Sequence, residues 1–286
     1  MNNETTYLLE TAIRAAREGG QLALSRLDHP GYRKWKGPGD LLASAVLEMQ
    51  ERIVEVIRQE LPDANFLLEE SEAAQDEGAN PLWIIDPLDG SLNFFHGIPS
   101  FAISIAYRLN STYRLGVVYD PCRDELFHAA LNGGAFLNGQ PIHVDKFSDG
   151  MDALHAAMVG TDWRGSTEDI KRAFQLARFV AGEVLHIQNV GAPTLGLCYV
   201  AAGRLHAYYG LEYLRLWDVA AASVILQAAG GVLTDIAGGS WLYAQEGYLA
   251  TNGVIHGSML GVISPVRKLQ RQSVALRQGQ ALAVES

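Results

Sequence analysis

Three apolar segments within residues 101–131 constrain the fold of this chain more than any other feature of the sequence. The segments FAISIAYRL, YRLGVVYD and ELFHAAL are separated only by the short turns NST and PCRD. Short apolar runs bounded by turn residues are typical of consecutive strands in one sheet. We therefore predict an antiparallel meander, followed by a hairpin around Asn138 and Gly139.

Two amphipathic helices are predicted before this meander. Apolar side chains recur near the helical period over residues 4–27, and again from a candidate N-cap at Ser44 to about Leu61, where Pro62 ends the helix. The glycine- and proline-rich segment between them, HPGYRKWKGPGD, is predicted to be a loop. The segments NFLLEES and LWIID are short, apolar and end in acids, which indicates buried strands.

Strand-length and helix-length segments alternate in the second half of the chain, a pattern typical of α/β proteins. We predict an N-terminal α+β half at 1–145, a C-terminal α/β half at 146–265 and a disordered tail at 266–286. The expected elements are strands near 155–161, 205–210, 232–235 and 247–253, a short segment at 184–191, and helices near 166–182, 194–203 and 217–231.

Composition and charge exclude several classes of function. The chain has 286 residues, 48% of them hydrophobic, and a net charge of −10, whereas nucleic-acid grooves are built from clustered Lys and Arg. Cys122 and Cys198 are far apart and form neither a disulfide framework nor a thiolate metal site. No apolar run approaches the roughly 20 residues that span a bilayer. We expect a cytoplasmic protein that binds neither nucleic acid nor membrane.

Acids follow apolar segments at three places: Glu69 and Glu70, Asp86 and Asp89, and Asp218. Any one of these is explained by a helix cap or a turn. Together they indicate a cleft in which the carboxylates repel one another unless a cation lies between them. Oxygen ligands without His or Cys select Mg²⁺, Mn²⁺ or Ca²⁺ rather than zinc.

The residues directly after Asp89 suggest a phosphate site next to these acids. If residues 90–95 open a helix or a tight turn, their free backbone amides point at an anion. Gly90 has no side chain to keep that anion away from the backbone. A metal beside such amides suits phosphoryl chemistry.

The segment WIIDPLDGSLNFFHG resembles the signature of the inositol monophosphatase family, DP(I/L)DG(T/S)xNF. Two further blocks are similar to that family in the same order along the chain. The first is YDPCRDELFHA with GGAFLNGQPI, and the second is GAPTLGLCYVAAGRLHAYY with LWDVAAASVILQAAGGVLTD. The resemblance thus extends over nearly the whole chain. It implies a layered αβαβα sandwich and a Mg²⁺-dependent, lithium-sensitive phosphatase that uses metal-activated water.

The resemblance also assigns roles to individual residues. It implies a homodimer acting on a small phosphorylated metabolite, with two or three Mg²⁺ ions for which Mn²⁺ or Ca²⁺ can substitute. Ser91 is expected to act in catalysis beside the acids. The implied metal ligands are Glu69, Asp86, Asp89, Asp218 and the carbonyl of Leu88, and the implied substrate contacts are Asp89, Gly90, Ser91, Gly191, Ala192 and Glu212.

Some positions depart from the family pattern. The family usually places an acid before its second helix to take the proton of the attacking water, but Val46 stands there, and Ala43 replaces a nearby hydroxyl. Leu211 occupies the usual position of a substrate-binding Glu, although Glu212 follows it. General-base assistance is typically worth about 10²- to 10⁴-fold, so we expect a slow enzyme rather than a dead one.

Three functions remain open at this point. The first is Mg²⁺-dependent hydrolysis of a small inositol, sugar or nucleotide phosphate. The second is a weak or inactive relative that binds metal and a phosphorylated ligand, which Val46 favours. The third is a changed reaction at the same metals in specialised metabolism. Because clustered acids must be neutralised, a chain without catalytic duty has little reason to keep them, and this favours the hydrolase.

Overall fold

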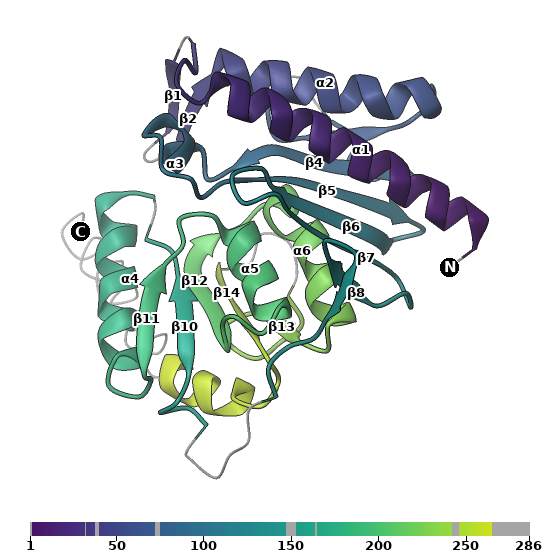
Figure 1. Ribbon diagram of the computed structural model, residues 1–286. Helices are drawn as coiled ribbons and strands as arrows, with labels where there is room; N and C mark the ends of the chain where they lie inside the picture. The colour runs from purple at the N-terminus through teal and green to yellow at the C-terminus, as the bar shows by residue number, and fades with distance from the viewer. Residues whose placement is uncertain are drawn as a thin grey trace, which may run out of the picture.

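The structure is a computed structural model with five alternating layers (Figure 1). Helices α1 and α2 lie outermost, followed by a seven-stranded sheet, helices α5 and α6, a five-stranded sheet, and helix α4. This is the predicted αβαβα sandwich. The described residues are 2–31, 33–37, 40–71, 75–146, 153–163, 165–241 and 246–264, without the side chains of 33–37, 40–43, 212, 213 and 246.

The two predicted N-terminal helices are confirmed as α1 (Asn3–Arg26) and α2 (Ser44–Glu60). Asn2 caps α1, because its side chain accepts a hydrogen bond from the Thr5 amide at 2.8 Å. The apolar faces of both helices pack against one face of the seven-stranded sheet and form a buried cluster with it. The helices thereby keep that face of the sheet away from water.

The predicted loop between these helices is wrong. Residues 33–37 and 40–43 form a two-stranded antiparallel ribbon, β1 (Arg33–Gly37) and β2 (Asp40–Ala43). The segment RKWKGPGDLLA has no period-2 alternation of apolar residues, and its Pro and Gly residues indicated a loop throughout. In the structure Gly37 ends β1 and Asp40 begins β2, so two short paired strands lie where the sequence indicated only a loop.

The predicted meander is confirmed within a seven-stranded sheet of order β3-β4-β5-β6-β7-β8-β9. Strands β3 and β4 are parallel, and every later neighbouring pair is antiparallel. The strands are β3 (Phe66–Leu68), β4 (Leu82–Asp89), β5 (Ala102–Leu109), β6 (Thr112–Asp120), β7 (Glu125–Ala130), β8 (Ala135–Leu137) and β9 (Gln140–Ile142).

A second, five-stranded sheet follows later in the chain, with the order β11-β10-β12-β14-β13. Strand β10 runs parallel to both β11 and β12, so their carboxyl ends meet at one edge, whereas β14 is antiparallel to its two neighbours. The strands are β10 (Met158–Thr161), β11 (His186–Asn189), β12 (Ala207–Tyr213), β13 (Val232–Thr234) and β14 (Glu246–Thr251).

Helices α5 (Pro193–Ala201) and α6 (Leu216–Ala228) fill the space between the two sheets, in the largest apolar cluster of the described residues. Both helices are buried on nearly all sides, which explains their almost wholly apolar sequences. The backbone of α6 approaches β6 closely at Gly116, where a Cβ atom would lie 2.2 Å from the carbonyl oxygen of Ala221. This close approach holds the second turn of α6 directly against β6.

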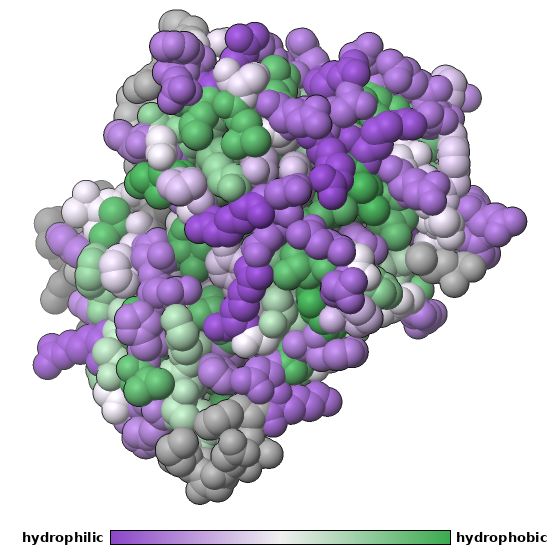
Figure 2. All heavy atoms as spheres, in the orientation of Figure 1, coloured by the Kyte–Doolittle hydropathy of each residue, from purple (hydrophilic) through white to green (hydrophobic). Residues whose placement is uncertain are grey.

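Helix α4 (Thr167–Val180) covers the other face of the five-stranded sheet, together with a helical segment at 256–264 that the sequence did not predict. The predicted disordered tail at 266–286 lies outside the described residues. Within the described ranges, no helix has the length and apolar character needed to cross a membrane. On the face seen in Figure 2, hydrophilic side chains cover most of the surface and hydrophobic ones form separate groups.

Candidate active site

Strand β4 carries Asp86 and Asp89 to one point although their spacing opposes it. In a regular strand, side chains three positions apart point to opposite faces of the sheet. The pairing of β4 with β5 shifts register between Asp86 and Asp89, and Pro87 lies in that irregular stretch. The Asp86 carboxylate also accepts a hydrogen bond from the amide of Leu88 at 2.8 Å. The bulge therefore turns both buried carboxylates toward the same place.

Asp218 approaches them from the other half of the chain, in the first turn of α6. Its carboxylate accepts a hydrogen bond from the Arg215 amide at 2.7 Å, and the helix N-terminus stabilises negative charge there. One carboxylate oxygen from each of Asp86, Asp89 and Asp218 lies within 4.8 Å of the other two, and all three residues are buried. The structure thus brings three of the four predicted acidic ligands into one group.

Glu69 adjoins this group through Asp86. The Glu69 amide donates to the carbonyl of Ile85 at 3.2 Å, which prolongs the parallel pairing of β3 with β4. Gln50 on α2 holds the next residue, because its side-chain amide exchanges hydrogen bonds with the backbone of Glu70 at 2.7 and 3.0 Å. The Glu69 side chain is hydrogen-bonded to that of Asp86. All four predicted carboxylates therefore converge.

Burial raises the pKa of Asp86 well above its ordinary value, and the neighbouring charges of Glu69, Asp89 and Asp218 raise it further. A divalent cation neutralises such repulsion. The donors are carboxylate oxygens, and neither His nor Cys belongs to the group of three. Hard oxygen donors fit Mg²⁺, Mn²⁺ or Ca²⁺, so the donor set agrees with the cation expected from the sequence.

The turn after Asp89 requires a glycine. Gly90 has a φ of 86°, and a Cβ atom there would lie 2.8 Å from the carbonyl oxygen of Ser100 and 3.2 Å from the Cβ of Ala192. The predicted helical turn follows as α3 (Ser91–Phe95). Gly90 therefore lies against Ala192, the N-cap of α5, and Gly191 lies against the Asn93 side chain of α3. Gly90, Gly191 and Ala192 of the predicted phosphate-side residues thus meet at this turn, and Ser91 follows Gly90 directly in the chain.

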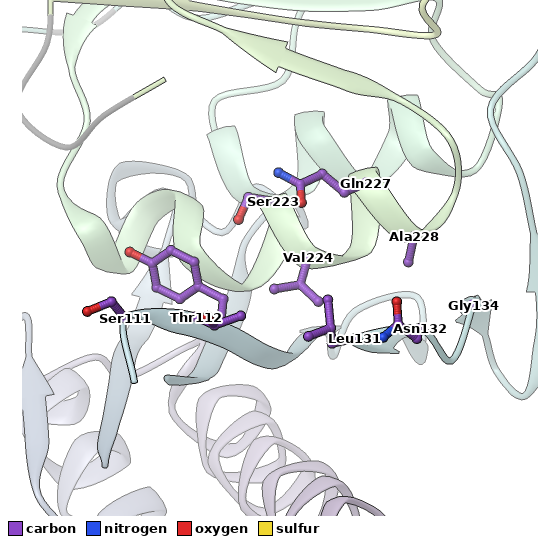
Figure 3. Close-up of a pocket in the computed structure, with 10 residues that line it drawn as sticks. Ser111, Thr112, Leu131, Asn132, Gly134, Ser223, Val224, Gln227 and Ala228 are labelled. Atoms are coloured by element: carbon purple, nitrogen blue, oxygen red, sulfur yellow. The ribbon is translucent and has the colours of Figure 1, made fainter. Parts of the chain in front are cut away.

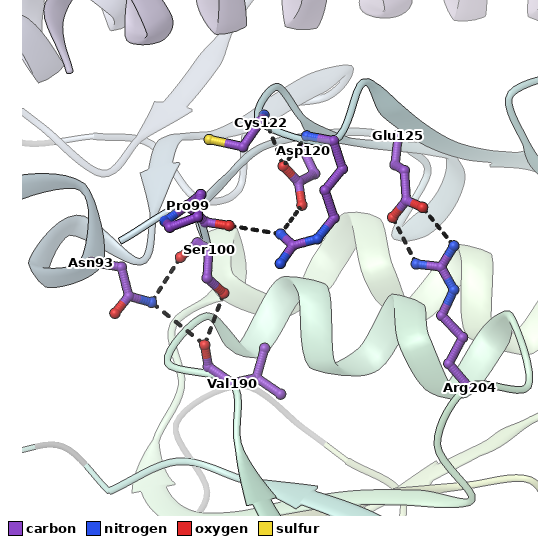
Figure 4. A network of polar contacts seen from close by, with 9 residues as sticks. Asn93, Pro99, Ser100, Asp120, Cys122, Glu125, Val190 and Arg204 are labelled. Atoms are coloured by element: carbon purple, nitrogen blue, oxygen red, sulfur yellow. Dashed lines mark hydrogen bonds and ion pairs between the residues drawn. The ribbon is translucent and has the colours of Figure 1, made fainter. Parts of the chain in front are cut away.

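A polar network fastens this junction (Figure 4). The Asn93 side chain donates to the carbonyls of Ser100 at 2.7 Å and Gly191 at 3.2 Å, and the Ser100 hydroxyl donates to the carbonyl of Val190 at 2.9 Å. Arg123 extends the network by donating to the carbonyl of Pro99 at 2.7 Å. The loop after α3 is thereby tied to the end of β11.

The positions that depart from the family pattern have definite surroundings. Val46 is buried in an apolar cluster with Leu88, Phe94 and Phe101, so the position that the resemblance assigns to an acid is part of the core here. Leu211 packs against the cluster beneath α4. The side chains of Ala43 and Glu212 lie outside the described part of the structure. Their predicted roles stay predictions.

Several residues that position the site were not predicted from the sequence. Ser104 and Thr194 are buried single polar residues within the apolar segments FAISIAY and APTLGL, and that isolation is the signal that could have revealed them. Asp162 is also buried, where it accepts hydrogen bonds from the Gly191 amide at 2.7 Å and from the Tyr208 hydroxyl. It thereby holds residue 191 in place.

A pocket of about 430 Å³ lies away from these acids (Figure 3). It is bounded by the β5–β6 turn, the β7–β8 turn and the middle and end of α6, and none of the four acids lines it. Ser223 and Gln227 contribute polar groups from α6, and Leu131 contributes an apolar wall. The pocket and the acidic group are therefore separate features of α6.

Comparison with known proteins agrees with this geometry. The chain is 35% identical over 255 residues to inositol monophosphatase 1 of Solanum lycopersicum, covering 88% of this chain and 92% of that protein. It is 34% identical over 250 residues to the Nus factor SuhB of Pasteurella multocida, covering 85% and 90%. The solved structure of a Thermotoga maritima IMPase superposes with a TM-score of 0.82 at 31% identity, covering 91% of this chain and 98% of that one.

The sequence profile of the inositol monophosphatase family matches residues 4–269. That range includes both halves of the chain, both sheets and every acid of the group at the junction. The relatives cover the chain to a similar extent, so the likeness is not confined to the signature. This protein belongs to the inositol monophosphatase family.

Proposed function

We propose that this chain hydrolyses a small phosphomonoester of an inositol, sugar or nucleotide in a Mg²⁺-dependent reaction. The observation that carries the proposal is the meeting of Asp86, Asp89 and Asp218, which come from two halves of the chain and place three buried carboxylate oxygens within 4.8 Å. The Gly90 turn, with its φ of 86°, lies next to them. Acids beside a close backbone turn suit a phosphate group held against a cation.

Each residue has a distinct task in this proposal. Glu69, Asp86, Asp89, Asp218 and the carbonyl of Leu88 hold the cation, whose contribution is to lower the pKa of the attacking water and to stabilise developing negative charge. The backbone amides at residues 90, 91, 191 and 192 hold and orient the phosphate oxygens. The apolar residues Leu88, Phe94 and Phe101 back the turn and exclude water from that side.

The names of the relatives support the substrate class only coarsely. One is named an inositol monophosphatase and one solved structure an IMPase, so inositol phosphates are the first substrates to test. At position 211, Leu replaces the Glu with which inositol phosphatases usually bind the substrate. We therefore extend the proposal to sugar and nucleotide phosphates. A homodimer remains part of the proposal, on the basis of the sequence resemblance.

The proposal is tested by a phosphate-release screen. Inositol monophosphates, sugar phosphates and nucleotide 3′-phosphates are incubated with the protein and Mg²⁺, and again with EDTA. We expect release from at least one substrate, dependent on Mg²⁺ and lost in Asp218→Asn but kept in Asp63→Asn, which changes an exposed acid in the turn after α2. Release that persists in Asp218→Asn would show a contaminating phosphatase, and no release by the parent would refute hydrolysis.

A second candidate is a binding or regulatory role without useful catalysis. Two observations favour it: the apolar burial of Val46 and the name Nus factor SuhB carried by a relative at 34% identity. In that case the protein binds Mg²⁺ and a phosphorylated ligand, but the screen gives no turnover. Calorimetry with inositol monophosphate in the presence of Mg²⁺ separates the two, because binding without release is expected only for the second.

A further inference from the structure

Two buried hydroxyl groups hold the first turn of α6, which carries Asp218. The Thr194 hydroxyl donates to the backbone carbonyl of Asp218 at 3.0 Å, and the Ser104 hydroxyl donates to that of Trp217 at 3.1 Å. Both side chains are nearly inaccessible, with 0% exposure for Thr194 and 1% for Ser104. Neither hydroxyl faces solvent, so each is committed to this contact.

The same two residues are also connected to the other two acids. The Thr194 amide donates to the carboxylate of Asp89 at 2.8 Å. Ser104 on β5 is the direct cross-strand partner of Asp86 on β4. The contacts therefore form a closed circuit that runs from Asp86 through Ser104 to the first turn of α6, then through Thr194 to Asp89, and back along β4.

This circuit counteracts the electrostatic repulsion between the three acids. Three carboxylates with oxygens within 4.8 Å repel one another, and their burial strengthens that repulsion. Asp218 belongs to a different half of the chain from Asp86 and Asp89, so the repulsion is relieved if the halves separate slightly. The contacts of Ser104 and Thr194 oppose this movement, because they join α6, which carries Asp218, to β5, which pairs with β4, and to α5, which binds Asp89.

We propose that Thr194 and Ser104 are positioning residues that hold the three acids at cation-binding spacing before the cation arrives. The inference rests on the proposed Mg²⁺ dependence and adds to it the groups that set the Mg²⁺ affinity. Partners that orient metal ligands typically change metal affinity by about 10- to 100-fold when they are removed. We expect about a tenfold rise in the Mg²⁺ dissociation constant for the loss of either hydroxyl.

The variants are Thr194→Val, which keeps the size and the amide but removes the hydroxyl, and Ser104→Ala. Thr194→Ser restores the hydroxyl and is expected to recover most of the parent affinity. Ser223→Ala is the matched control, because that buried hydroxyl also donates to a helix carbonyl, Ala220 at 2.8 Å, but only within α6 itself. It joins no second element, so its Mg²⁺ affinity should equal that of the parent.

Mg²⁺ affinity is measured without substrate, by calorimetry and by the rise in melting temperature across a Mg²⁺ titration. If the two hydroxyls only stabilise the fold, their loss lowers the melting temperature in EDTA. The midpoint of the Mg²⁺ titration, which is the Mg²⁺ concentration of half-maximal binding, then stays unchanged. The inference is supported if the midpoint moves in Thr194→Val and Ser104→Ala and returns in Thr194→Ser. It is overturned if the parent binds Mg²⁺ and both hydroxyl variants bind it equally well, or if Ser223→Ala weakens binding as much.

A different result would count against the proposed function instead. If the parent protein shows neither heat of binding nor a rise in melting temperature with Mg²⁺, the metal dependence itself fails. Should Thr194→Val not fold, Ser104→Ala still decides the question, since it removes only one oxygen atom from the circuit: an unchanged Mg²⁺ dissociation constant in that variant would overturn the inference.

Discussion

The two sides of the turn that follows β4 differ in character: one is acidic and agrees with the family pattern, and the other is apolar and departs from it. On one side, Asp86 and Asp89 face Asp218 in a buried group of like charges. On the other side, Leu88 and Phe94 face Val46 in a closed apolar cluster. The acidic side has the carboxylate oxygens that a cation needs. On the apolar side, Val46 stands where the resemblance expects an acid that accepts a proton.

The residues proposed to bind the cation and the position at which the resemblance expects a proton acceptor thus lie on different sides of the turn. The bulge in β4 and the hydrogen bonds of Thr194 and Ser104 lie on the acidic side, and none of them involves residue 46. On the apolar side, Val46 is buried together with Leu88 and Phe94.

Asp86→Asn should abolish the proposed function of the acidic side, which is to bind the cation. It removes a central carboxylate of the group while keeping the shape of the side chain, and metal catalysis is worth several kcal/mol. We expect phosphate release to fall at least about 1,000-fold and Mg²⁺ to give no rise in melting temperature. Steady-state kinetics and thermal melts with and without Mg²⁺ measure both effects.

The same variant has an opposite effect in the absence of metal. Because the substitution removes one of several repelling charges, the melting temperature in EDTA should equal or exceed that of the parent. Asp63→Asn, at an exposed turn, should change neither melting temperature nor Mg²⁺ response. A marked loss of stability of Asp86→Asn in EDTA would mean that the carboxylate holds the fold together, rather than waiting for a cation.

Val46→Asp tests the apolar side by adding the missing acid. If Ser91 lies near enough to share a proton with it, kcat should rise at least about tenfold. In the parent, activity should rise toward alkaline pH, where the attacking water loses its proton without a protein base, and the variant should reach its maximum at a lower pH. Rates from pH 6 to 9.5 show the shift, and adding Ala43→Thr should strengthen it.

Val46→Asp is also expected to lower the free energy of unfolding. Val46 is only 2% exposed, and a carboxylate there costs at least about 2 kcal/mol unless a partner satisfies it. Val46→Asn is the control, since it has similar size and polarity but cannot accept the proton as a base. An equal gain in rate from Val46→Asn, or a parent that is already fast at pH 7, would show that another group removes the proton.

The sequence indicated Asp86, Asp89 and Gly90 because their signal is local. The order of Asp86, Pro87, Asp89 and Gly90 is readable over a few positions, whereas Asp218 was assigned to the same group from the pattern of acids after apolar segments and from the family resemblance. The circuit through Ser104 and Thr194 was not predictable, because it depends on the register of β4 with β5 and on how α5 meets α6. The contacts of the circuit join residues 113, 105 and 24 positions apart, and no local pattern contains them.

A smaller effect is expected on the substrate side. If Glu212 has taken over the role of the acid that Leu211 replaces, Glu212→Gln should raise KM about fivefold with little change in kcat, which is the mark of lost uniform binding. Glu183→Gln, an exposed acid between α4 and β11, is the matched control and should leave KM unchanged. An unchanged KM in Glu212→Gln would leave substrate binding to other groups.

Effects on stability rather than on catalysis are expected where the turn is anchored to the rest of the protein. Arg123 contacts the Asp120 carboxylate at 2.8 Å and the Pro99 carbonyl, whereas Arg204 pairs with Glu125 through two contacts of 2.6 Å nearer the surface (Figure 4). Asp120 is fully buried, so Arg123→Gln leaves a buried carboxylate without its cation. Since Arg123 is itself half-exposed, we expect a loss of about 1 to 2 kcal/mol, against less than about 1 kcal/mol for Arg204→Gln.

The pH dependence distinguishes this anchoring from simple loss of packing. Burial raises the pKa of Asp120 above its usual 3.8, and Arg123 opposes that rise. A raised pKa means that the folded chain holds the proton more tightly, so this group's contribution to stability falls as pH rises from about 3.8 through the folded pKa. Removing Arg123 raises the folded pKa of Asp120 further and so extends this pH range upward. The loss in the free energy of unfolding of Arg123→Gln, relative to the parent, should therefore be small at pH 4 and largest near pH 7. Urea unfolding at both pH values measures it, and a deficit independent of pH would mean that only packing and the Pro99 contact were lost.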